Sequence, residues 1–213
     1  MKYFVANWKA NKTFDEVNRW IDIFLENYQP KDKAKIIICP PYPFIIPLRE
    51  KLKNKDNINF GAQDISQFEK GSFTGEVTAM MLFDLVDYVI IGHSERRQYF
   101  FEDEKIIEKK INQALKYKIK PILCIRNKQD RIYPGVTIVA YEPVYAIGTG
   151  YNEPKDEVIK LKKLLSLPKN AIFLYGGSVN EYNSKDYLNE EIAGLLIGNA
   201  SLDPNQLIKI IRY

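Results

Sequence analysis

Residues 88–97 pass directly from an apolar run into a polar turn: Tyr88-Val89-Ile90-Ile91-Gly92-His93-Ser94-Glu95-Arg96-Arg97. Aromatic and β-branched residues favour a strand, and an apolar run without polar alternation is typical of a parallel strand covered on both faces. The charged residues that follow would then stand at the carboxyl end of that strand. Because similar apolar runs recur along the chain, this stretch predicts one strand of a repeated strand-and-helix architecture.

Eight short apolar runs divide the chain. They occupy residues 3–6, 36–39, 58–61, 88–91, 121–125, 136–140, 171–175 and 193–197. Most segments between them have helical periodicity: Thr13 and Glu16 form a capping box before one helix, residues 106–115 form another, and Asp203-Pro204 opens the last. Strand–helix alternation repeated over eight strands predicts an α/β protein with a closed (β/α)8 barrel.

The length of the chain limits how this barrel can be built. Barrels of this kind typically have about 250 residues, with about 200 at the lower end, and this chain has 213. Only ten residues, 126–135, connect the fifth and sixth runs, whereas a parallel crossover normally needs a dozen or more. We therefore predict a trimmed barrel whose crossover between strands 5 and 6 is shortened and lacks a full helix, with Pro134-Gly135 as the turn. We find no linker or low-complexity segment, so we expect a single domain over residues 1–213.

Composition excludes several classes of protein. The 31 Lys and Arg residues against 27 Asp and Glu residues give a net charge of +4, which is too small for a nucleic-acid-binding surface. No apolar run reaches the length of a membrane span, and the stretch 3–8 is too short for a signal peptide. Cys39 and Cys124 lie inside apolar runs without metal or redox spacing, so we expect buried, reduced thiols. We expect a cytoplasmic protein without nucleic-acid or membrane partners.

Polar or glycine-rich residues follow several of the apolar runs. Asn7 and Lys9 follow the first run, Gly176-Gly177-Ser178 the seventh, and Gly198-Asn199 the eighth. In such barrels the catalytic groups stand at the carboxyl ends of the strands, and the loops after strands 7 and 8 often bind phosphate through backbone N–H groups. A glycine pair alone is more often a simple turn, but its position here favours a phosphate site.

His93 is the only histidine of the chain and follows the fourth run. A single histidine is more often structural than catalytic, and no second histidine or cysteine partner supports a metal, so we expect no metal site. Its position at the opening of a polar turn still favours a functional role. The N–H groups of a following helical turn would disfavour a positive ring, so we expect a neutral hydrogen-bond donor.

Glu142 follows the sixth run and would stand at the mouth of the barrel. A glutamate at a loop entry is usually exposed to solvent. The next eight residues, however, form an apolar loop with proline at one end and glycine toward the other, Pro143-Val144-Tyr145-Ala146-Ile147-Gly148-Thr149-Gly150. Such a loop suits a lid that excludes water from a site, which favours a functional role for Glu142 over an exposed position.

Several motifs resemble those of the triosephosphate isomerase family and occur in the same order. They are Asn7-Trp8-Lys9, residues 92–97, Tyr141-Glu142-Pro143-Val144, residues 146–150, Tyr175-Gly176-Gly177-Ser178-Val179 and, for the family's interface loop, Gly61-Ala62-Gln63-Asp64 and Phe73-Thr74-Gly75-Glu76. The likeness spans nearly the whole chain. It implies a TIM-barrel isomerase of glycolysis and gluconeogenesis that interconverts dihydroxyacetone phosphate and D-glyceraldehyde 3-phosphate without a cofactor.

The resemblance also implies a role for each matching residue. Glu142 would move the carbon-bound proton, while His93 and Lys9 would stabilise the oxyanion. Asn7 would orient the substrate, and Glu95 would pair with Lys9. The remaining roles fall on three groups: phosphate binding by Gly148, Ser178, Gly198 and Asn199; the lid of Pro143, Val144, Tyr145, Ala146, Ile147, Gly148, Thr149 and Gly150; and contacts to a second copy by Thr74 and Glu76 in loop 63–76. A homodimer, or a higher oligomer, is implied.

Three positions depart from the family pattern. Tyr145 stands where the family usually has tryptophan, Asn199 where a second glycine follows Gly198, and Arg126-Asn127 where Gly-Glu is usual. None of these changes removes a catalytic group. Two other interpretations stay open: a different phosphate-binding barrel, such as a sugar-phosphate epimerase or a biosynthetic lyase, and an inactive barrel that serves as an anion-binding or interaction scaffold. The first would not need His93, Glu142 and Lys9 together with this lid.

Overall fold

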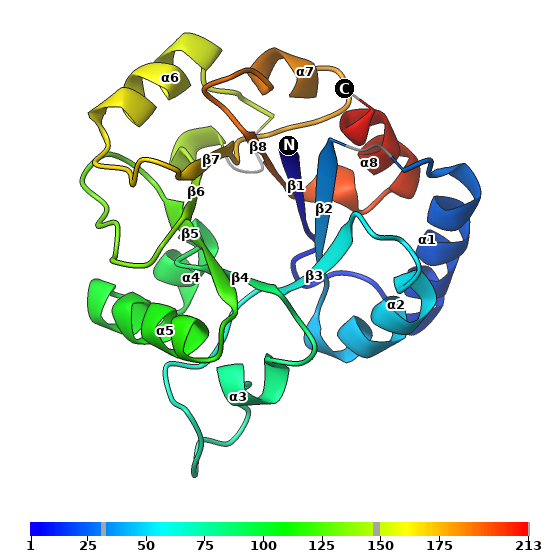
Figure 1. Ribbon diagram of the computed structural model, residues 1–213, viewed down its shortest axis with the longest axis horizontal. Helices are drawn as coiled ribbons and strands as arrows, with labels where there is room; N and C mark the ends of the chain where they lie inside the picture. Colours follow the sequence, from blue (N-terminus) through cyan, green and yellow to red (C-terminus); the bar gives the residue numbers. More distant parts are fainter. Residues whose placement is uncertain (31–32, 147–149, 213) are drawn as a thin grey trace.

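Eight parallel strands close into a barrel in chain order, β1 to β8, in the computed structural model (Figure 1). The structure describes residues 1–30, 33–146 and 150–212. The strands are β1 Lys2–Asn7, β2 Ala34–Cys39, β3 Ile58–Ala62, β4 Tyr88–Ile91, β5 Lys120–Ile125, β6 Ile138–Tyr141, β7 Ile172–Tyr175 and β8 Gly194–Ile197. Each corresponds to one of the apolar runs, so the predicted (β/α)8 architecture is confirmed.

Alternate residues of each strand face two different cores, which is why the runs are apolar at every position. In β1, Val5 belongs to a cluster built from strand residues alone, whereas Phe4 and Ala6 pack in a second cluster with side chains of the surrounding helices. The first cluster fills the inside of the barrel and includes both cysteines, which are buried free thiols as predicted. Desolvation raises the pKa of both thiols and keeps them protonated.

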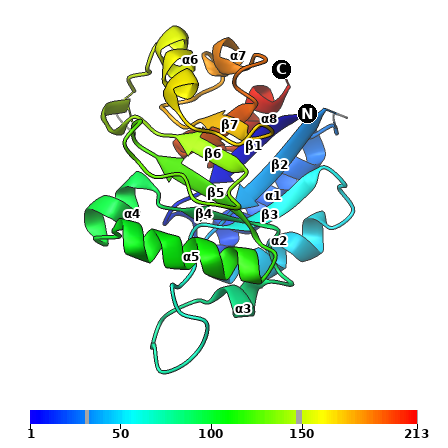
Figure 2. The ribbon, with the colours of Figure 1, turned by 60° about the vertical axis from the view of Figure 1, so that its left-hand side comes forward.

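Helices lie around the outside of the barrel (Figures 1 and 2). They are α1 Phe14–Asn27, α2 Ile45–Leu52, α3 Ala79–Leu82, α4 Ser94–Tyr99, α5 Glu104–Lys116, α6 Lys155–Leu164, α7 Ser184–Tyr187 and α8 Pro204–Ile211, with 3-10 turns η1 Tyr42–Phe44, η2 Val144–Ala146 and η3 Asn199–Ser201. The capping box of Thr13 and Glu16 is present at α1, and Asp203 caps α8. Among the described residues, no helix is both long and apolar enough to cross a membrane.

The crossover between β5 and β6 contains no helix, as its length predicts. Arg126 and Asp130 close it locally, because the guanidinium and the backbone N–H of Arg126 both bond to the Asp130 carboxylate. Tyr133 is 3% exposed and packs in the core cluster that the strands share with the helices, while its hydroxyl donates to the Glu104 backbone oxygen at 3.0 Å. Gly135 has a φ of 83°, which a glycine adopts without strain, so it makes the return turn.

One loop leaves the barrel between β3 and α3 and projects into solvent (Figure 2). Phe68 and Phe73 stack across this loop with ring centroids 3.7 Å apart. Glu69, at its base, accepts hydrogen bonds from Lys116 and Tyr117 at the end of α5. Contacts within the loop and contacts to the end of α5 therefore restrain it, although most of its residues are exposed.

Candidate active site

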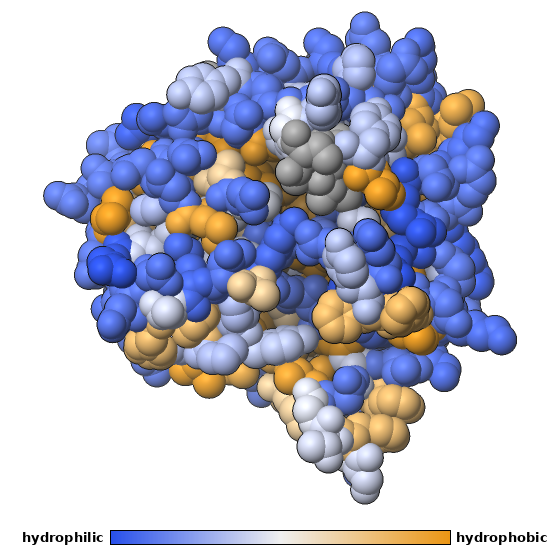
Figure 3. Space-filling model, turned by 180° about the vertical axis from the view of Figure 1, so that it is seen from behind, coloured by the Kyte–Doolittle hydropathy of each residue, from blue (hydrophilic) through white to orange (hydrophobic). Residues whose placement is uncertain are grey.

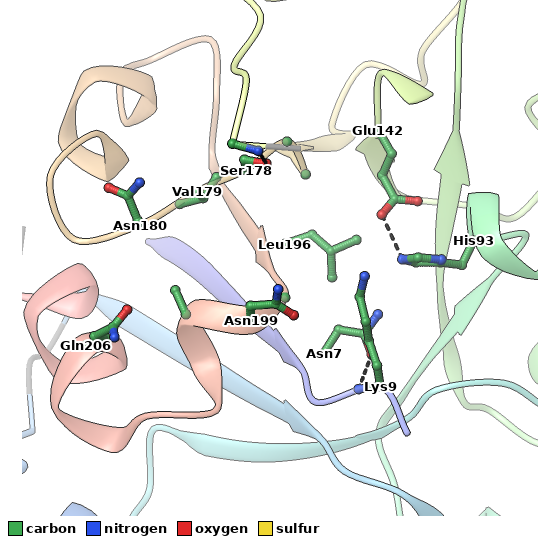
Figure 4. A pocket seen from close by; sticks show the side chains of 15 residues that line it. Asn7, Lys9, His93, Glu142, Ser178, Val179, Asn180, Leu196, Asn199 and Gln206 are labelled. Atoms are coloured by element: carbon green, nitrogen blue, oxygen red, sulfur yellow. Dashed lines mark hydrogen bonds and ion pairs between the residues drawn. The ribbon is translucent and has the colours of Figure 1, made fainter. Parts of the chain in front are cut away.

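A cavity of about 350 Å³ opens at the carboxyl ends of the strands (Figure 4). Its lining includes eight residues that the sequence analysis assigned to the site: Asn7, Lys9, His93, Glu142, Gly150, Ser178, Gly198 and Asn199. Barrel closure therefore brings together residues from the ends of β1, β4, β6, β7 and β8. Glu142 and His93 lie on one side of the cavity, and Asn180, Asn199 and Gln206 lie on the other (Figure 4).

Glu142 is almost completely buried, with 2% of its surface exposed. Its backbone N–H continues the β5 pairing by donating to the Ile125 oxygen at 2.8 Å. Its Oε1 atom lies 2.9 Å from the Nε2 atom of His93, and its Oε2 atom accepts the Ser94 backbone N–H at 3.4 Å. Desolvation raises the pKa of this carboxyl, but the contact with His93 outweighs it and holds the pKa below its ordinary value.

His93 caps the N-terminus of α4, and its ring is held at both nitrogens. Nδ1 accepts the Glu95 backbone N–H at 3.2 Å, and Nε2 lies 2.9 Å from the Glu142 Oε1. A ring that accepts at Nδ1 carries its proton on Nε2, so the geometry fits the predicted neutral donor. Burial lowers the pKa of His93, but the Glu142 carboxylate raises it above its ordinary value, contrary to our expectation from the helical turn.

Lys9 stands at the end of β1 in a left-handed conformation with a φ of 53°. This conformation is uncommon outside glycine and is held here by its neighbours. The Lys9 N–H donates to the Asn7 side chain at 3.1 Å, and the Gln63 side chain donates to the Lys9 oxygen at 2.9 Å. Its ammonium lies 2.5 Å from Glu95, so the predicted pair forms, although Glu95 itself does not line the cavity.

Small residues shape the cavity beyond Glu142. A Cβ on Gly176 would lie 2.9 Å from the Glu142 side chain, and a Cβ on Gly177 would lie 2.0 Å from the Tyr175 hydroxyl oxygen. Glycine is therefore required at both positions by contact distance alone. The Ser178 hydroxyl accepts the Gly150 N–H at 3.2 Å, which ties the loop after β7 to the end of the lid. The 3-10 turn η3 follows Gly198 at the end of β8.

The other assigned residues belong to the lid and to loop 63–76. Val144 and Tyr145 are 53% and 59% exposed, whereas Pro143 is buried. Ile147, Gly148 and Thr149 were assigned to the lid or to phosphate binding, and they lie outside the described residues. Thr74 and Glu76 belong to loop 63–76 and are not among the residues that line the cavity of their own chain. Within the described part of the chain, no three His, Cys, Asp or Glu side chains are grouped to hold a metal.

A sequence profile described as triosephosphate isomerase matches residues 2–213. The chain belongs to the triosephosphate isomerase family. It is 36% identical to the triosephosphate isomerase of Aquifex aeolicus over 99% of this chain and 98% of that protein. It is 37% identical to the enzyme of that name from Dictyoglomus turgidum, over 99% and 98% of the two chains, and 37% identical to that of Finegoldia magna, over 98% and 96%.

Membership of the triosephosphate isomerase family agrees with the trimmed architecture. The alignment with the Aquifex aeolicus protein runs over 243 positions, more than the 213 residues of this chain, so that relative contains segments missing here. The described chain has no helix between β5 and β6, and α3 and α7 are single-turn helices. None of these short segments lines the cavity.

Two polar lining residues were not identified from the sequence. Asn180 lies two positions after the Gly-Gly-Ser motif. A polar residue in the loop after β7 could therefore have been assigned to the site from the sequence. Gln206 lies in the first turn of α8, where its sequence context indicates only a helix start. Both present amides to the side of the cavity away from Glu142 (Figure 4).

Proposed function

We propose that the chain interconverts dihydroxyacetone phosphate and D-glyceraldehyde 3-phosphate in glycolysis and gluconeogenesis. The observation that carries this proposal is the contact of 2.9 Å between Glu142 and His93 inside a cavity whose far side is glycine-rich. A base and a hydrogen-bond donor that face the same small volume suit proton transfer beside a carbonyl. The glycine-rich side suits a phosphate, which backbone N–H groups can approach closely.

Glu142 takes the proton from the carbon next to the carbonyl and returns it to the neighbouring carbon. The carbonyl oxygen becomes an enediolate oxygen, and the Nε2–H of His93 and the Lys9 ammonium stabilise its charge. Substrate must first separate Glu142 from His93, because each now occupies the other's hydrogen-bonding site. When Glu142 carries the proton it is neutral, so the largest contribution that raises the pKa of His93 is lost, which favours a neutral ring.

Other residues of the site hold Lys9 in place or bind the phosphate of the substrate. Asn7 and Glu95 hold Lys9 from its backbone and from its ammonium, which fixes a long side chain that would otherwise be mobile. Gly148, Ser178, Gly198 and Asn199 bind the phosphate by their backbone N–H groups, under the lid of residues 143–150. The chemistry assigned to these residues uses no cofactor and no metal, and a single cytoplasmic domain performs it.

A homodimer through loop 63–76 completes the proposal, with Thr74 and Glu76 in the contact. Large apolar side chains gather on the molecular surface beside this loop (Figure 3). The loop and the elements nearby expose Phe73, Met81, Phe83, Tyr99, Phe100 and Phe101 by 41% to 83%. Phe101 is also in a left-handed conformation, with a φ of 56°, which costs free energy for an aromatic residue. Exposed apolar groups of this size favour burial against a second copy.

The deciding experiment is isomerisation of D-glyceraldehyde 3-phosphate by the purified protein, assayed with and without a metal chelator. We expect turnover that the chelator does not change, and loss of turnover in Glu142→Gln. An inactive wild-type protein with a native circular dichroism spectrum would contradict the proposal and favour the scaffold interpretation.

A further inference from the structure

We propose that Arg97 is a positioning residue for the proton transfer, because its guanidinium holds the backbone turn from which His93 projects. This inference rests on the proposed function of His93 as the donor to the substrate oxygen. Arg97 belongs to α4, is 9% exposed and is not among the residues that line the cavity. It therefore acts through His93 and not on the substrate.

The first contact is with the peptide bond that enters His93. The Nε atom of Arg97 donates to the Gly92 backbone oxygen at 2.8 Å, and that oxygen belongs to the peptide bond between Gly92 and His93. Gly92 has a φ of 71°, and a Cβ there would lie 3.1 Å from the Nη2 atom of Arg97. The turn and the guanidinium are therefore packed directly against each other.

A second contact ties this turn to the neighbouring strand. The Nη2 atom of Arg97 donates to the Cys124 backbone oxygen at 3.3 Å. The pairing of β4 with β5 runs up to Ile91 opposite Leu123, and Gly92 and Cys124 are the next residues along these strands. The guanidinium thus bridges the first pair of residues beyond the paired part of the two strands, and it fixes the turn relative to β5.

The backbone of Arg97 holds His93 from the other side. The His93 backbone oxygen accepts the N–H groups of Arg96 at 2.9 Å and of Arg97 at 3.1 Å. Both peptide oxygens that flank the His93 backbone are therefore bonded to Arg97. A rotation of this turn would carry the imidazole with it and would move the Nε2 atom away from its position 2.9 Å from Glu142.

The guanidinium is itself fixed, because each of its three nitrogens has a partner. The Nη1 atom lies 2.8 Å from the Glu104 Oε1 atom, while the Tyr133 hydroxyl bonds to the Oε2 atom and the backbone oxygen of Glu104. Partners at all three nitrogens use the planar fork of arginine, which lysine cannot reproduce. Tyr133 lies in the helix-free crossover, so a chain of contacts runs from that crossover to His93.

The test compares Arg97→Lys with wild type. Lysine keeps the positive charge, but its single ammonium cannot replace the fork that bridges the two backbone oxygens. We expect kcat to fall by roughly ten- to hundred-fold, because a small displacement of a catalytic group is enough for such a loss. Competitive inhibition by inorganic phosphate should match that of wild type, since Arg97 is remote from the glycine-rich side of the cavity.

Arg49→Lys is the matched control. The Arg49 guanidinium also donates to a backbone oxygen, that of Leu85 at 2.6 Å, but Arg49 belongs to α2 and is not among the cavity residues. This variant removes an arginine contact to the backbone without touching the His93 turn. It should therefore keep the wild-type kcat, whatever its effect on the free energy of unfolding.

Nuclear magnetic resonance separates positioning from a general loss of structure. His93 is the only histidine, so ¹⁵N-labelled histidine reports on a single ring. Above the pH at which the ring titrates, the wild-type shifts should be those of one tautomer, because Nδ1 accepts the Glu95 N–H and leaves the proton on Nε2. In Arg97→Lys the two shifts should move toward the average of both tautomers. Arg49→Lys should retain the wild-type shifts.

A second variant covers the case in which Arg97→Lys does not fold. Glu104→Gln removes the charge that orients the guanidinium and leaves both backbone oxygens in place, so kcat and the ring shifts should change in the same direction by a smaller amount. In a folded Arg97→Lys protein, wild-type kcat, unchanged ring shifts beside a lowered kcat, or an equal loss in Arg49→Lys would each overturn the proposal. If only Glu104→Gln folds, unchanged kcat and unchanged shifts in that variant would overturn it.

Failure of the proposed function is distinguishable from failure of this inference. An inactive wild-type protein would refute the isomerase proposal. The comparison of ring shifts needs no turnover, so it would still decide whether Arg97 sets the orientation of His93.

Discussion

The Nε2 atom of His93 lies 2.9 Å from the Oε1 atom of Glu142, and both side chains are almost completely buried. Each group offsets the desolvation of the other, so neither is an isolated polar group in the barrel mouth. Under the proposed function, a substrate oxygen would meet His93 and a substrate carbon would meet Glu142 at adjacent points of the cavity. Predictions about chemistry and about stability both follow from this pair.

Replacement of the base should affect chemistry more than binding. We expect Glu142→Gln to lower kcat by about 10²- to 10⁴-fold or more, because a general base commonly contributes that amount. Glu142→Asp withdraws the carboxylate by one methylene group and should also be strongly impaired. Steady-state kinetics with inorganic phosphate as competitive inhibitor measures both effects. Near-normal kcat in a folded Glu142→Gln protein would show that the base is another residue, and Glu95 would be tested next.

The contribution of His93 and Glu142 to the free energy of unfolding should pass through a maximum as pH changes. The folded pKa of Glu142 is below its unfolded value of 4.5, so its contribution is present above 4.5 and is lost as pH falls through the folded pKa. The folded pKa of His93 is above 6.5, so its contribution is present below 6.5 and is lost as pH rises through the folded pKa. The free energy of unfolding of wild type minus that of Glu142→Gln should therefore be largest between pH 4.5 and 6.5.

Urea denaturation of the two proteins across this pH range measures the difference. Glu157→Gln, which changes an exposed carboxylate on α6, serves as the control and should give no such maximum. A difference that is constant from pH 4 to pH 8 would show that His93 and Glu142 are not coupled in the folded protein.

The crossover without a helix should depend on Tyr133. Tyr133→Phe removes the hydroxyl that bonds to Glu104 and should lower the free energy of unfolding by about 0.5–1.5 kcal/mol. Tyr133→Ala also removes a buried ring, for which losses of about 3–5 kcal/mol are usual. Tyr99→Phe is the matched control, because Tyr99 is 65% exposed. Equal stability of Tyr133→Ala and wild type would mean that the ring does not replace the missing helix.

The turn after β7 should not tolerate a side chain at Gly177. A Cβ there would lie 2.0 Å from the Tyr175 hydroxyl oxygen, so Gly177→Ala must displace either the ring or the turn. Because the turn leads to Ser178, we expect a higher KM and weaker inhibition by phosphate. A crystal structure of the variant with phosphate would identify which group moved. Unchanged KM in Gly177→Ala would argue against phosphate binding by this loop.

The projecting loop should control association and activity together. Thr74→Arg places a charged side chain on this loop and should shift the protein to monomer at micromolar concentration, with a parallel loss of activity. Asp56→Arg introduces the same residue before β3, at the opposite end of the barrel, and should leave both properties unchanged. Sedimentation velocity with activity measured on the same samples is the test. A fully active monomer, wild-type or variant, would contradict the dimer.

Local features of this fold could be predicted because they depend on neighbours in the sequence. Continuous apolar runs indicated buried parallel strands, Thr13 and Glu16 indicated a helix start, and the ten residues 126–135 ruled out a full crossover helix. The positions of Glu142, His93 and Lys9 followed from the same pattern, because parallel strands of a barrel end on one face. The motifs that resemble the triosephosphate isomerase family added their roles.

Contacts across the closed barrel were decided by tertiary structure alone. Gln206 reaches the cavity from α8, the pKa of His93 is raised by a residue 49 positions away, and the backbone of Glu153 bonds to the hydroxyls of Tyr175 and Tyr187. A hydrogen bond depends on distances of a few tenths of an ångström, which are set only when strands, helices and loops pack together. Apolar patterning determines which residues are buried, but it contains no information about which polar atoms meet.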